Sequence, residues 1–289
     1  EGDFRQIKKL KEKNYFFIMS KYQSALIEHI ENHPDFIKPE SRRNEVLGFL
    51  RKPLNDLCIS RPKSRLNWGI EIPFDNDYVT YVWFDALLNY ITAIGWENDK
   101  EKFNHYWPAN YHLIGKDILT THAVYWPTML LAAGLPLPKT IFAHGWWMSD
   151  KSKMSKSIGN VVDPLDLIDA YGVDSVRFFL MRDMVLGMDA NFSMEAFIKR
   201  YNADLANDYG NLMNRVTMLI HKYFDGKIPT GGNYNETDLE LLGMAKTKPG
   251  EIKKEFSQMK IHDALENTMS LLRKINAYLE TKAPWKTVK

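Results

Sequence analysis

Hydrophobic and polar positions follow different patterns in the two halves of the chain. Between 56 and 150, short runs of β-branched and aromatic residues alternate with segments of helical period, which predicts strands and helices in turn. This alternation favours βαβ units and a parallel sheet, whose ligands bind at the carboxyl ends of the strands. We expect strands at 57–59, 78–84, 111–115 and 140–145, with helices at 85–94 and 117–133.

Outside this region the spacing of apolar residues is helical. Segments 15–32 and 42–49 are expected helices near the N-terminus. Ser193 is a good N-cap for a long helix, and helical spacing continues to Ala283, interrupted by a Gly-, Asn- and Thr-rich loop at 225–237. The second half therefore predicts an antiparallel helix bundle, and the fold class is α/β followed by all-α.

Composition limits the class of protein. The 289 residues suggest about two domains, and 45% of them are hydrophobic, without an apolar run long enough for a membrane span. A single cysteine, Cys58, leaves no intrachain disulfide and no cysteine zinc site. These features favour a cytoplasmic protein, with an organelle as the alternative, and they leave the oligomeric state open.

Charge is almost balanced, with 38 Lys and Arg against 36 Asp and Glu. A nucleic-acid contact would therefore need a local basic patch, because the bulk charge supplies no attraction.

The lysine segment, residues 153–157, reads KMSKS and is followed by Gly159. Two ammonium groups beside serine hydroxyls suit a loop that contacts a polyphosphate. The expected role of Lys153 and Lys156 is to stabilise charge that develops on a pyrophosphate leaving group. Taken without its context, the same string is more often a solvated lysine-rich turn.

The lysine segment matches the KMSKS signature of class I aminoacyl-tRNA synthetases, and further strings resemble the methionyl-tRNA synthetases among them. These strings are YVWFDA at 81–86, HLIGKDI at 112–118, YWP at 125–127, AHGW at 143–146, NLMNR at 211–215 and APW at 283–285. The other signature of the class, HIGH, is absent. We therefore expect part of a longer or split enzyme, which by itself forms no aminoacyl adenylate.

The resemblance implies a division into four parts. The first is a connecting helical segment, and the second is the later part of a doubly wound, Rossmann-like catalytic sheet. A small stem-contact α/β segment with the lysine segment follows, and then an anticodon-binding helix bundle. Their expected ranges are 1–55, 56–150, 151–192 and 193–289.

A methionine pocket follows from the resemblance. Aromatic rings make favourable contacts with a thioether sulfur, and His122 is expected to donate a hydrogen bond to it. Without the resemblance, Trp83 and Tyr90 would be ordinary core aromatics and His122 a satisfied core histidine. The implied methionine-binding residues are Trp83, Ala86, Tyr90, Asp117 and His122.

The resemblance also implies an ATP site, with Mg²⁺ on the phosphates. No metal ligands are expected within this chain, and its single cysteine excludes a cysteine zinc site. Arg61 joins the two lysines as a catalytic residue, because a guanidinium suits oxyanions. The alternatives are a helix N-cap for Asp117 and a surface arginine for Arg61. The implied ATP-binding residues are Lys153, Lys156, Gly115, Asp117, His144 and Trp146.

In the bundle, the resemblance assigns Asn211, Arg215 and Trp285 to the anticodon of tRNA(Met). An amide, a guanidinium and an indole can read and stack an unstacked base. From the residues alone, a helix–helix hydrogen bond for Asn211 and a packed bundle end for Trp285 are favoured.

The implied function is methionine–tRNA ligase, which joins L-methionine to tRNA(Met) through methionyl adenylate and releases AMP and pyrophosphate. A class I synthetase for another apolar amino acid is one alternative. A non-catalytic tRNA-binding module is another, because HIGH is missing. A dinucleotide-dependent oxidoreductase is disfavoured, since the sequence has no G-x-G-x-x-G.

Overall fold

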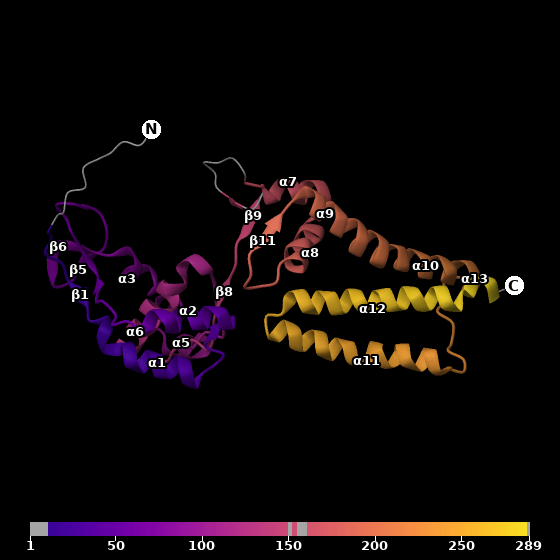
Figure 1. Ribbon diagram of the computed structural model, residues 1–289, viewed down its shortest axis with the longest axis horizontal. Helices are drawn as coiled ribbons and strands as arrows, with labels where there is room; N and C mark the ends of the chain where they lie inside the picture. The colour runs from indigo at the N-terminus through magenta and orange to yellow at the C-terminus, as the bar shows by residue number, and fades with distance from the viewer. Residues whose placement is uncertain (1–10, 150–151, 155–160, 288–289) are drawn as a thin grey trace. The chain divides into compact units, whose positions relative to one another are not determined.

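The computed structural model describes residues 11–149, 152–154 and 161–287. The chain divides into two compact units, Glu1–Ala143 and His144–Lys289. The first unit holds several small sheets with helices packed beside them, and the second holds a small sheet followed by long helices (Figure 1).

The first unit contains a three-stranded sheet in the order β2-β8-β7. Its strands are β2 (Ile37–Lys38), β7 (His112–Gly115) and β8 (Ile141–His144). Strands β2 and β8 are parallel, with Ile37 opposite Ile141. A parallel sheet with strands at 111–115 and 140–145 is thus confirmed, but its third strand comes from 37–38.

The predicted strand at 78–84 is wrong in its second half. Strand β6 (Asp75–Thr80) ends before Tyr81, and 82–86 forms the helix α3 (Val82–Ala86). Trp83 packs in one apolar cluster with Leu87 and Ile91, and the helical turns that carry them place residues four apart on one face. Helical spacing therefore prevailed over the β-propensity of the local residues.

Strand β6 also lies in a different sheet from the one expected. It pairs antiparallel with β4 (Ser60–Pro62) and with β5 (Glu71–Ile72). This antiparallel sheet, in the order β4-β6-β5, contains no βαβ unit, so the parallel sheet is smaller than the sequence alternation indicates.

The helix predicted at 15–32 begins later than expected. Strand β1 (Phe16–Phe17) pairs antiparallel with β3 (Leu57–Cys58), and a 3₁₀ turn, η1 (Met19–Tyr22), precedes α1 (Gln23–Asn32). The second predicted helix is confirmed as α2 (Glu40–Leu50), which begins two residues earlier than expected, with Pro39 as its N-cap.

Between β6 and β8 the chain is mainly helical. The expected helix at 117–133 is divided into a 3₁₀ turn, a π-helix and an α-helix, which ends before Gly134 at a φ of 67°. These elements are α4 (Asn89–Thr92), α5 (Lys100–Tyr106), η2 (Lys116–Ile118), η3 (Thr121–Tyr125) and α6 (Trp126–Ala132).

The second unit starts with a sheet in the order β10-β9-β11. Its strands are β9 (Trp147–Ser149), β10 (Ser152–Lys153) and β11 (Ala190–Phe192). The helices α7 (Pro164–Tyr171) and α8 (Val173–Asp183) follow β10. The side chain of Asp163 caps α7, and Gly172 ends it at a φ of 82°.

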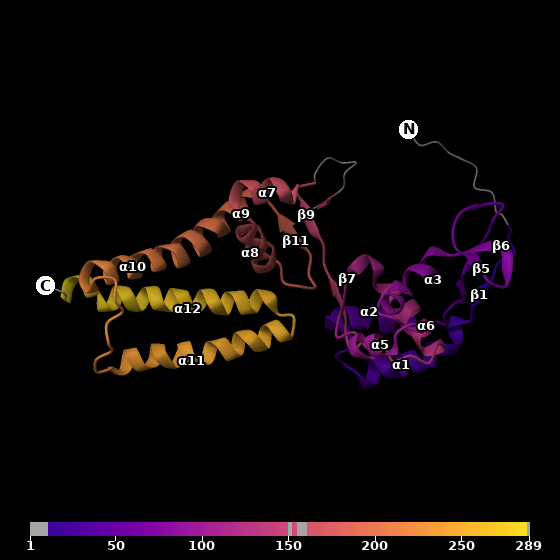
Figure 2. The ribbon, with the colours of Figure 1, turned by 180° about the vertical axis from the view of Figure 1, so that it is seen from behind.

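A long run of helix follows β11. Ser193 caps α9 (Met194–Arg200), as predicted, and the run continues as a π-helix, η4 (Tyr201–Gly210), and as α10 (Asn211–Phe224). Helices α11 (Glu236–Ser257) and α12 (Ile261–Lys282) form an antiparallel hairpin, and α13 (Pro284–Thr287) follows (Figure 2). The predicted C-terminal helical region is confirmed.

An ion-pair network joins α8 to η4 and α12. Arg182 is buried, and its Nε lies 3.3 Å from Oδ2 of buried Asp204. Arg182 also pairs with Glu266, while Arg200 lies 2.7 Å from Asp183 and 3.3 Å from Asp204. Alternating charges compensate one another where solvent is excluded.

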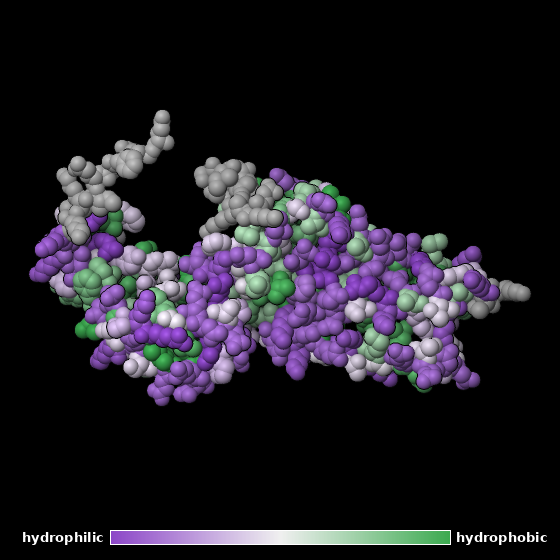
Figure 3. Space-filling view, in the orientation of Figure 1, coloured by the Kyte–Doolittle hydropathy of each residue, from purple (hydrophilic) through white to green (hydrophobic). Residues whose placement is uncertain are grey.

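The visible face of the second unit is mostly hydrophilic, with hydrophobic residues in small separate patches (Figure 3). In the part of the chain that the structure describes, no helix combines the length and the hydrophobicity that a membrane crossing requires.

Candidate active site

Three of the predicted methionine-binding residues form one cluster in the first unit. The phenol oxygen of Tyr90, on α4, lies 2.9 Å from Nε2 of His122, on η3. The indole of Trp83, on α3, meets the His122 ring edge-on, with 6.4 Å between the ring centroids. Three short helices thus bring together residues that are up to 39 positions apart.

The hydrogen bonds of His122 define its tautomer. Nδ1 lies 3.0 Å from the carbonyl oxygen of Ile118, which can only accept, so Nδ1 carries the proton. In the neutral ring Nε2 is then an acceptor, and the Tyr90 hydroxyl donates to it. Burial lowers the pKa of His122, and the bond to Ile118 opposes this only in part. The ring therefore stays neutral at physiological pH.

This arrangement changes the expected role of His122. Both ring nitrogens already have partners within the chain, so Nε2 has no proton to donate to a thioether sulfur. His122 fixes the Tyr90 phenol instead, and the expectation of a direct hydrogen bond from His122 to the sulfur is not supported by this geometry.

A second buried histidine, His112 on β7, lies behind Tyr90. The ring centroids of Tyr90 and His112 are 4.3 Å apart. The indole N–H of Trp126 donates to Nε2 of His112 over 3.3 Å. Burial, and to a smaller extent the nearby His122, lower the pKa of His112 to about 4.

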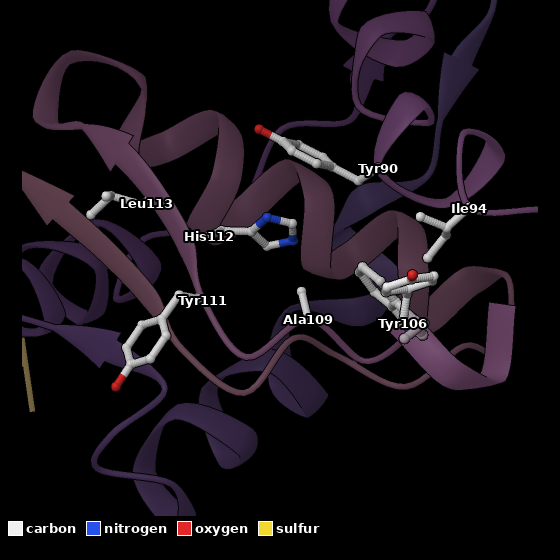
Figure 4. Close-up of a pocket in the computed structure, with 8 residues that line it drawn as sticks. Tyr90, Ile94, Tyr106, Ala109, Tyr111, His112 and Leu113 are labelled. Atoms are coloured by element: carbon white, nitrogen blue, oxygen red, sulfur yellow. The ribbon is translucent and has the colours of Figure 1, made fainter. Parts of the chain in front are cut away.

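A pocket of about 270 Å³ opens beside these rings. Figure 4 shows the His112 imidazole between Tyr90 and Ala109, with Tyr106 and Ile94 to one side. The hydroxyl of Tyr90 points away from Tyr106, and 38% of Tyr90 is exposed. The pocket is lined by Tyr90, Ile94, Tyr106, Trp107, Ala109, Tyr111, His112 and Leu113.

The remaining residues predicted for this region lie on the adjoining segments. Ala86 is the last residue of α3 and is half-buried. Gly115 ends β7 and is the N-cap of η2, while Asp117 lies inside that turn with an exposed side chain. The alternative role of Asp117 as a helix N-cap is therefore wrong. Asp117 immediately precedes Ile118, whose carbonyl orients His122.

Arg61 lies on β4, and its guanidinium covers the ring of Tyr81 at 4.5 Å. Its Nη1 donates to the carbonyl of Ser60 at 2.7 Å and lies 3.2 Å from Sγ of Cys58. Tyr81 is the N-cap of α3, so the stacking connects Arg61 to the helix that carries Trp83. Arg61 also lines a pocket of about 490 Å³ together with Arg65.

The other predicted nucleotide-binding residues belong to the second unit. The Nδ1 atom of His144 donates to the carbonyl of Gly145 at 2.7 Å, and the backbone N–H of Trp146 donates to Asp189 at 2.9 Å. A Cβ on Gly145 would lie 2.2 Å from the carbonyl oxygen of Met188. Only glycine therefore lets the segments around 145 and 188 approach so closely.

The lysine segment is described only in part. Lys153 ends β10 and is opposite Met148 in the antiparallel pair with β9. Lys156 lies outside the described residues. The predicted roles of both lysines remain predictions.

In the bundle, the structure brings two of the predicted anticodon residues together. The guanidinium carbon of Arg215 lies 5.3 Å from the centre of the Trp285 ring, although 70 positions separate them. Arg215 also pairs with Glu280 at 2.6 Å. Asn211 lies one turn earlier on α10, and its Nδ2 donates to Oδ1 of Asn207 at 3.4 Å. This contact is exposed and lies within one run of helix, so the alternative of a buried helix–helix hydrogen bond is wrong.

A pocket of about 320 Å³ adjoins Arg215 and Trp285. It is also lined by Lys222 and Tyr223 on α10, which sequence reasoning missed, as it missed His112 and Ile118 in the first unit. The four-residue spacing from Arg215 to Leu219 and Tyr223 was the available signal for the bundle residues.

Across the described ranges, no group of three or more His, Cys, Asp and Glu residues is arranged to hold a metal ion.

Comparison with known proteins identifies the class. Residues 5–217 match the family described as tRNA synthetases class I (M). The chain belongs to this family of class I synthetases, as the KMSKS segment and the accompanying strings predict.

Similar relatives narrow the resemblance to one kind of class I synthetase, the methionine–tRNA ligases. The methionine–tRNA ligase of Clostridium acetobutylicum is 50% identical over 283 residues, which are 97% of this chain and 44% of that protein. The methionine–tRNA ligase of Rickettsia bellii is 46% identical over 279 residues, 96% of this chain and 54% of that protein. The chain thus spans about half the length of the curated relatives that it matches.

A solved structure has the same fold. The methionyl-tRNA synthetase of Mycobacterium tuberculosis in complex with methionyl-adenylate superposes with a TM-score of 0.92 and 45% identity, covering 96% of this chain and 54% of that one. Its apo form gives a TM-score of 0.88 at 42% identity.

Proposed function

We propose that the protein that carries this chain is a methionine–tRNA ligase, which activates L-methionine with ATP and transfers it to tRNA(Met). The observation that carries the proposal is the cluster of Trp83, Tyr90 and His122, with its internal hydrogen bond and two aromatic faces. The names of the relatives and the methionyl-adenylate in the related structure support it.

Methionine selection in this proposal depends on aromatic packing. Sulfur contacts with the rings of Trp83 and Tyr90 each contribute roughly 0.3–1.5 kcal/mol. His122 contributes indirectly, because its Nε2 holds the phenol hydroxyl and thereby orients the ring. Ala86, with its small side chain on the same helix as Trp83, leaves space for the unbranched methionine side chain.

The polar groups of the amino acid need charged partners. Asp117 is exposed in η2, the turn that follows β7, and is suited to the substrate ammonium group or a ribose hydroxyl. Gly115 allows a ribose to approach the backbone. Arg61 is pre-oriented by Tyr81 and is suited to the reacting carboxylate and the α-phosphate.

Activation is an in-line attack of the methionine carboxylate on the α-phosphate, which makes positioning and charge stabilisation the main tasks. In our proposal Lys153 and Lys156 neutralise the departing pyrophosphate, and His144 and Trp146 contact the adenosine. Mg²⁺ enters on the ATP phosphates, as it commonly does. Lys156→Ala should lower adenylate formation far more than methionine affinity, and equal losses would exclude the phosphate role.

Transfer to tRNA requires recognition of the anticodon. The pocket beside Arg215 and Trp285 has the size and chemistry for one unstacked base, with Asn211 nearby on the same helix face. In this proposal residues 193–289 bind the anticodon, and 151–192 contact the tRNA stem. A cytoplasmic location stays a prediction from composition.

Amino-acid-dependent ATP–pyrophosphate exchange in the complete protein tests the proposal. Methionine should stimulate exchange more than leucine, isoleucine and valine do. Stimulation by one of the others would favour a synthetase for another apolar amino acid. Salt-sensitive tRNA binding without any exchange would favour a non-catalytic module.

A further inference from the structure

We propose that His112 is a positioning residue for the methionine pocket, which holds the ring of Tyr90 in place through its own hydrogen bond to Trp126. This inference rests on the proposed function and assigns a role to a residue outside the predicted site.

The position of Tyr90 calls for such support. It lies on α4, a helix of only four residues, and 38% of the residue is exposed. Its hydroxyl is held by His122. A single hydrogen bond at the phenol oxygen does not fix the orientation of the ring plane. The pocket beside the ring supplies no packing on that side.

His112 supplies the missing contact. Its ring centroid lies 4.3 Å from that of Tyr90, at an interplanar angle of 56°. The ring centroid of Trp126, which is fully buried, lies 5.9 Å from that of Tyr90. The phenol is thereby supported at its hydroxyl by His122 and along its ring by His112 and Trp126.

The orientation of His112 is itself fixed. The indole N–H of Trp126 only donates, so Nε2 of His112 must accept and the proton of the neutral ring lies on Nδ1. The lowered pKa keeps the ring neutral at physiological pH, because a protonated imidazole would place two donors face to face. A leucine of similar volume could fill the same space but could not accept from Trp126.

Holding Tyr90 before methionine arrives removes an ordering cost from binding. Loss of the support should therefore raise the KM for methionine, while kcat and the KM for ATP change little. A residue that only fills the core would instead lower stability and the active fraction without a selective effect on methionine.

The test is ATP–pyrophosphate exchange in the complete protein with His112→Leu and His112→Gln. A loss of support worth one strong hydrogen bond should raise the KM for methionine about 10-fold in His112→Leu. In His112→Gln, whose amide oxygen can accept from Trp126, the increase should stay below about 3-fold. The KM for ATP should be unchanged in both, and His105→Gln, at an exposed histidine on α5, is the matched control.

Three results would overturn the inference: a wild-type KM for methionine in folded His112→Leu, equal increases in KM for methionine and ATP, or no rescue by glutamine. If His112→Leu does not fold, Trp126→Phe removes the donor instead and should raise the KM for methionine selectively. An unchanged KM for methionine in folded Trp126→Phe would likewise overturn the inference. A wild-type protein without methionine-dependent exchange would refute the proposed function itself, whereas an active wild type with unaffected variants refutes only the role of His112.

Discussion

The phenol oxygen of Tyr90 lies 2.9 Å from Nε2 of His122, although 32 positions separate the two residues. Because His122 donates through Nδ1 to the Ile118 carbonyl, its Nε2 can hold the tyrosine hydroxyl but cannot reach out to a ligand. The hydrogen bond therefore orients the Tyr90 ring, which forms one wall of the candidate pocket. His122 then acts on the substrate through Tyr90 and makes no hydrogen bond to it.

Tyr90→Phe tests this relationship. The ring remains but the tether is lost, which costs about 1 kcal/mol. We expect the KM for methionine to rise about 5-fold in the complete protein, as that free energy implies, with the KM for ATP unchanged. Tyr106→Phe removes an exposed phenol at the same pocket and should have no effect. Equal effects of the two substitutions would contradict the account.

Trp285→Ala separates the bundle from the catalytic chemistry. The indole lies beside the Arg215 guanidinium and lines the pocket proposed for a base. Loss of one stacking contact should weaken tRNA charging by about 10-fold or more, while ATP–pyrophosphate exchange remains intact. Phe256→Ala, at an exposed aromatic residue on α11, is the control. A parallel fall in exchange would argue against a separate anticodon role.

The stability of the chain should depend on pH through His112. Its pKa falls from 6.5 to about 4 on folding, so the unfolded chain binds the proton first as the pH decreases. The free energy of unfolding should therefore decline between pH 6.5 and pH 4, by up to roughly 3 kcal/mol from His112. Burial lowers the pKa of His122 and His29 as well, and they act in the same direction.

Urea unfolding between pH 7 and pH 4, followed by tryptophan fluorescence, measures this dependence. His112→Gln should reduce the slope of unfolding free energy against pH relative to the wild type. An identical slope in His112→Gln and the wild type would show that the histidine is not buried neutral.

Arg182→Met should strongly destabilise the second unit. Arg182 and Asp204 have side chains that are 6% and 5% exposed, and removal of one partner leaves a buried charge with less compensation. We expect a loss of about 3 kcal/mol in the free energy of unfolding. Lys248→Met, which breaks a more exposed pair with Glu251, should cost less than about 1 kcal/mol. Similar losses in thermal or urea unfolding would contradict a buried network.

The sequence predicted the parts of the fold that depend on local pattern. Strands β7 and β8, the N-cap Ser193 and the C-terminal helices all have clear local signals. Residues 82–84 were predicted as strand because valine, tryptophan and phenylalanine favour strands, whereas they form the first residues of α3. The short strand β2 carries too few residues for any periodicity, and only its pairing with β8 defines it.

The candidate site was predictable only through the resemblance. Trp83, Tyr90 and His122 have no shared sequence pattern, and a three-dimensional fold is needed to bring them together. Tautomers, the support from His112 and the Arg182 network depend on distances between distant segments. None of these can be read from spacing along the chain.

The central claim is that the aromatic cluster of Trp83, Tyr90 and His122 selects a thioether. The most direct measurement is the ratio of kcat/KM for methionine to that for norleucine, its sulfur-free isostere, in ATP–pyrophosphate exchange by the complete protein. We predict a preference for methionine of about 10-fold, equivalent to one strong sulfur–aromatic contact, which falls close to unity in Trp83→Ala. An unchanged ratio in Trp83→Ala, or equal use of the two amino acids by the wild type, would contradict the claim.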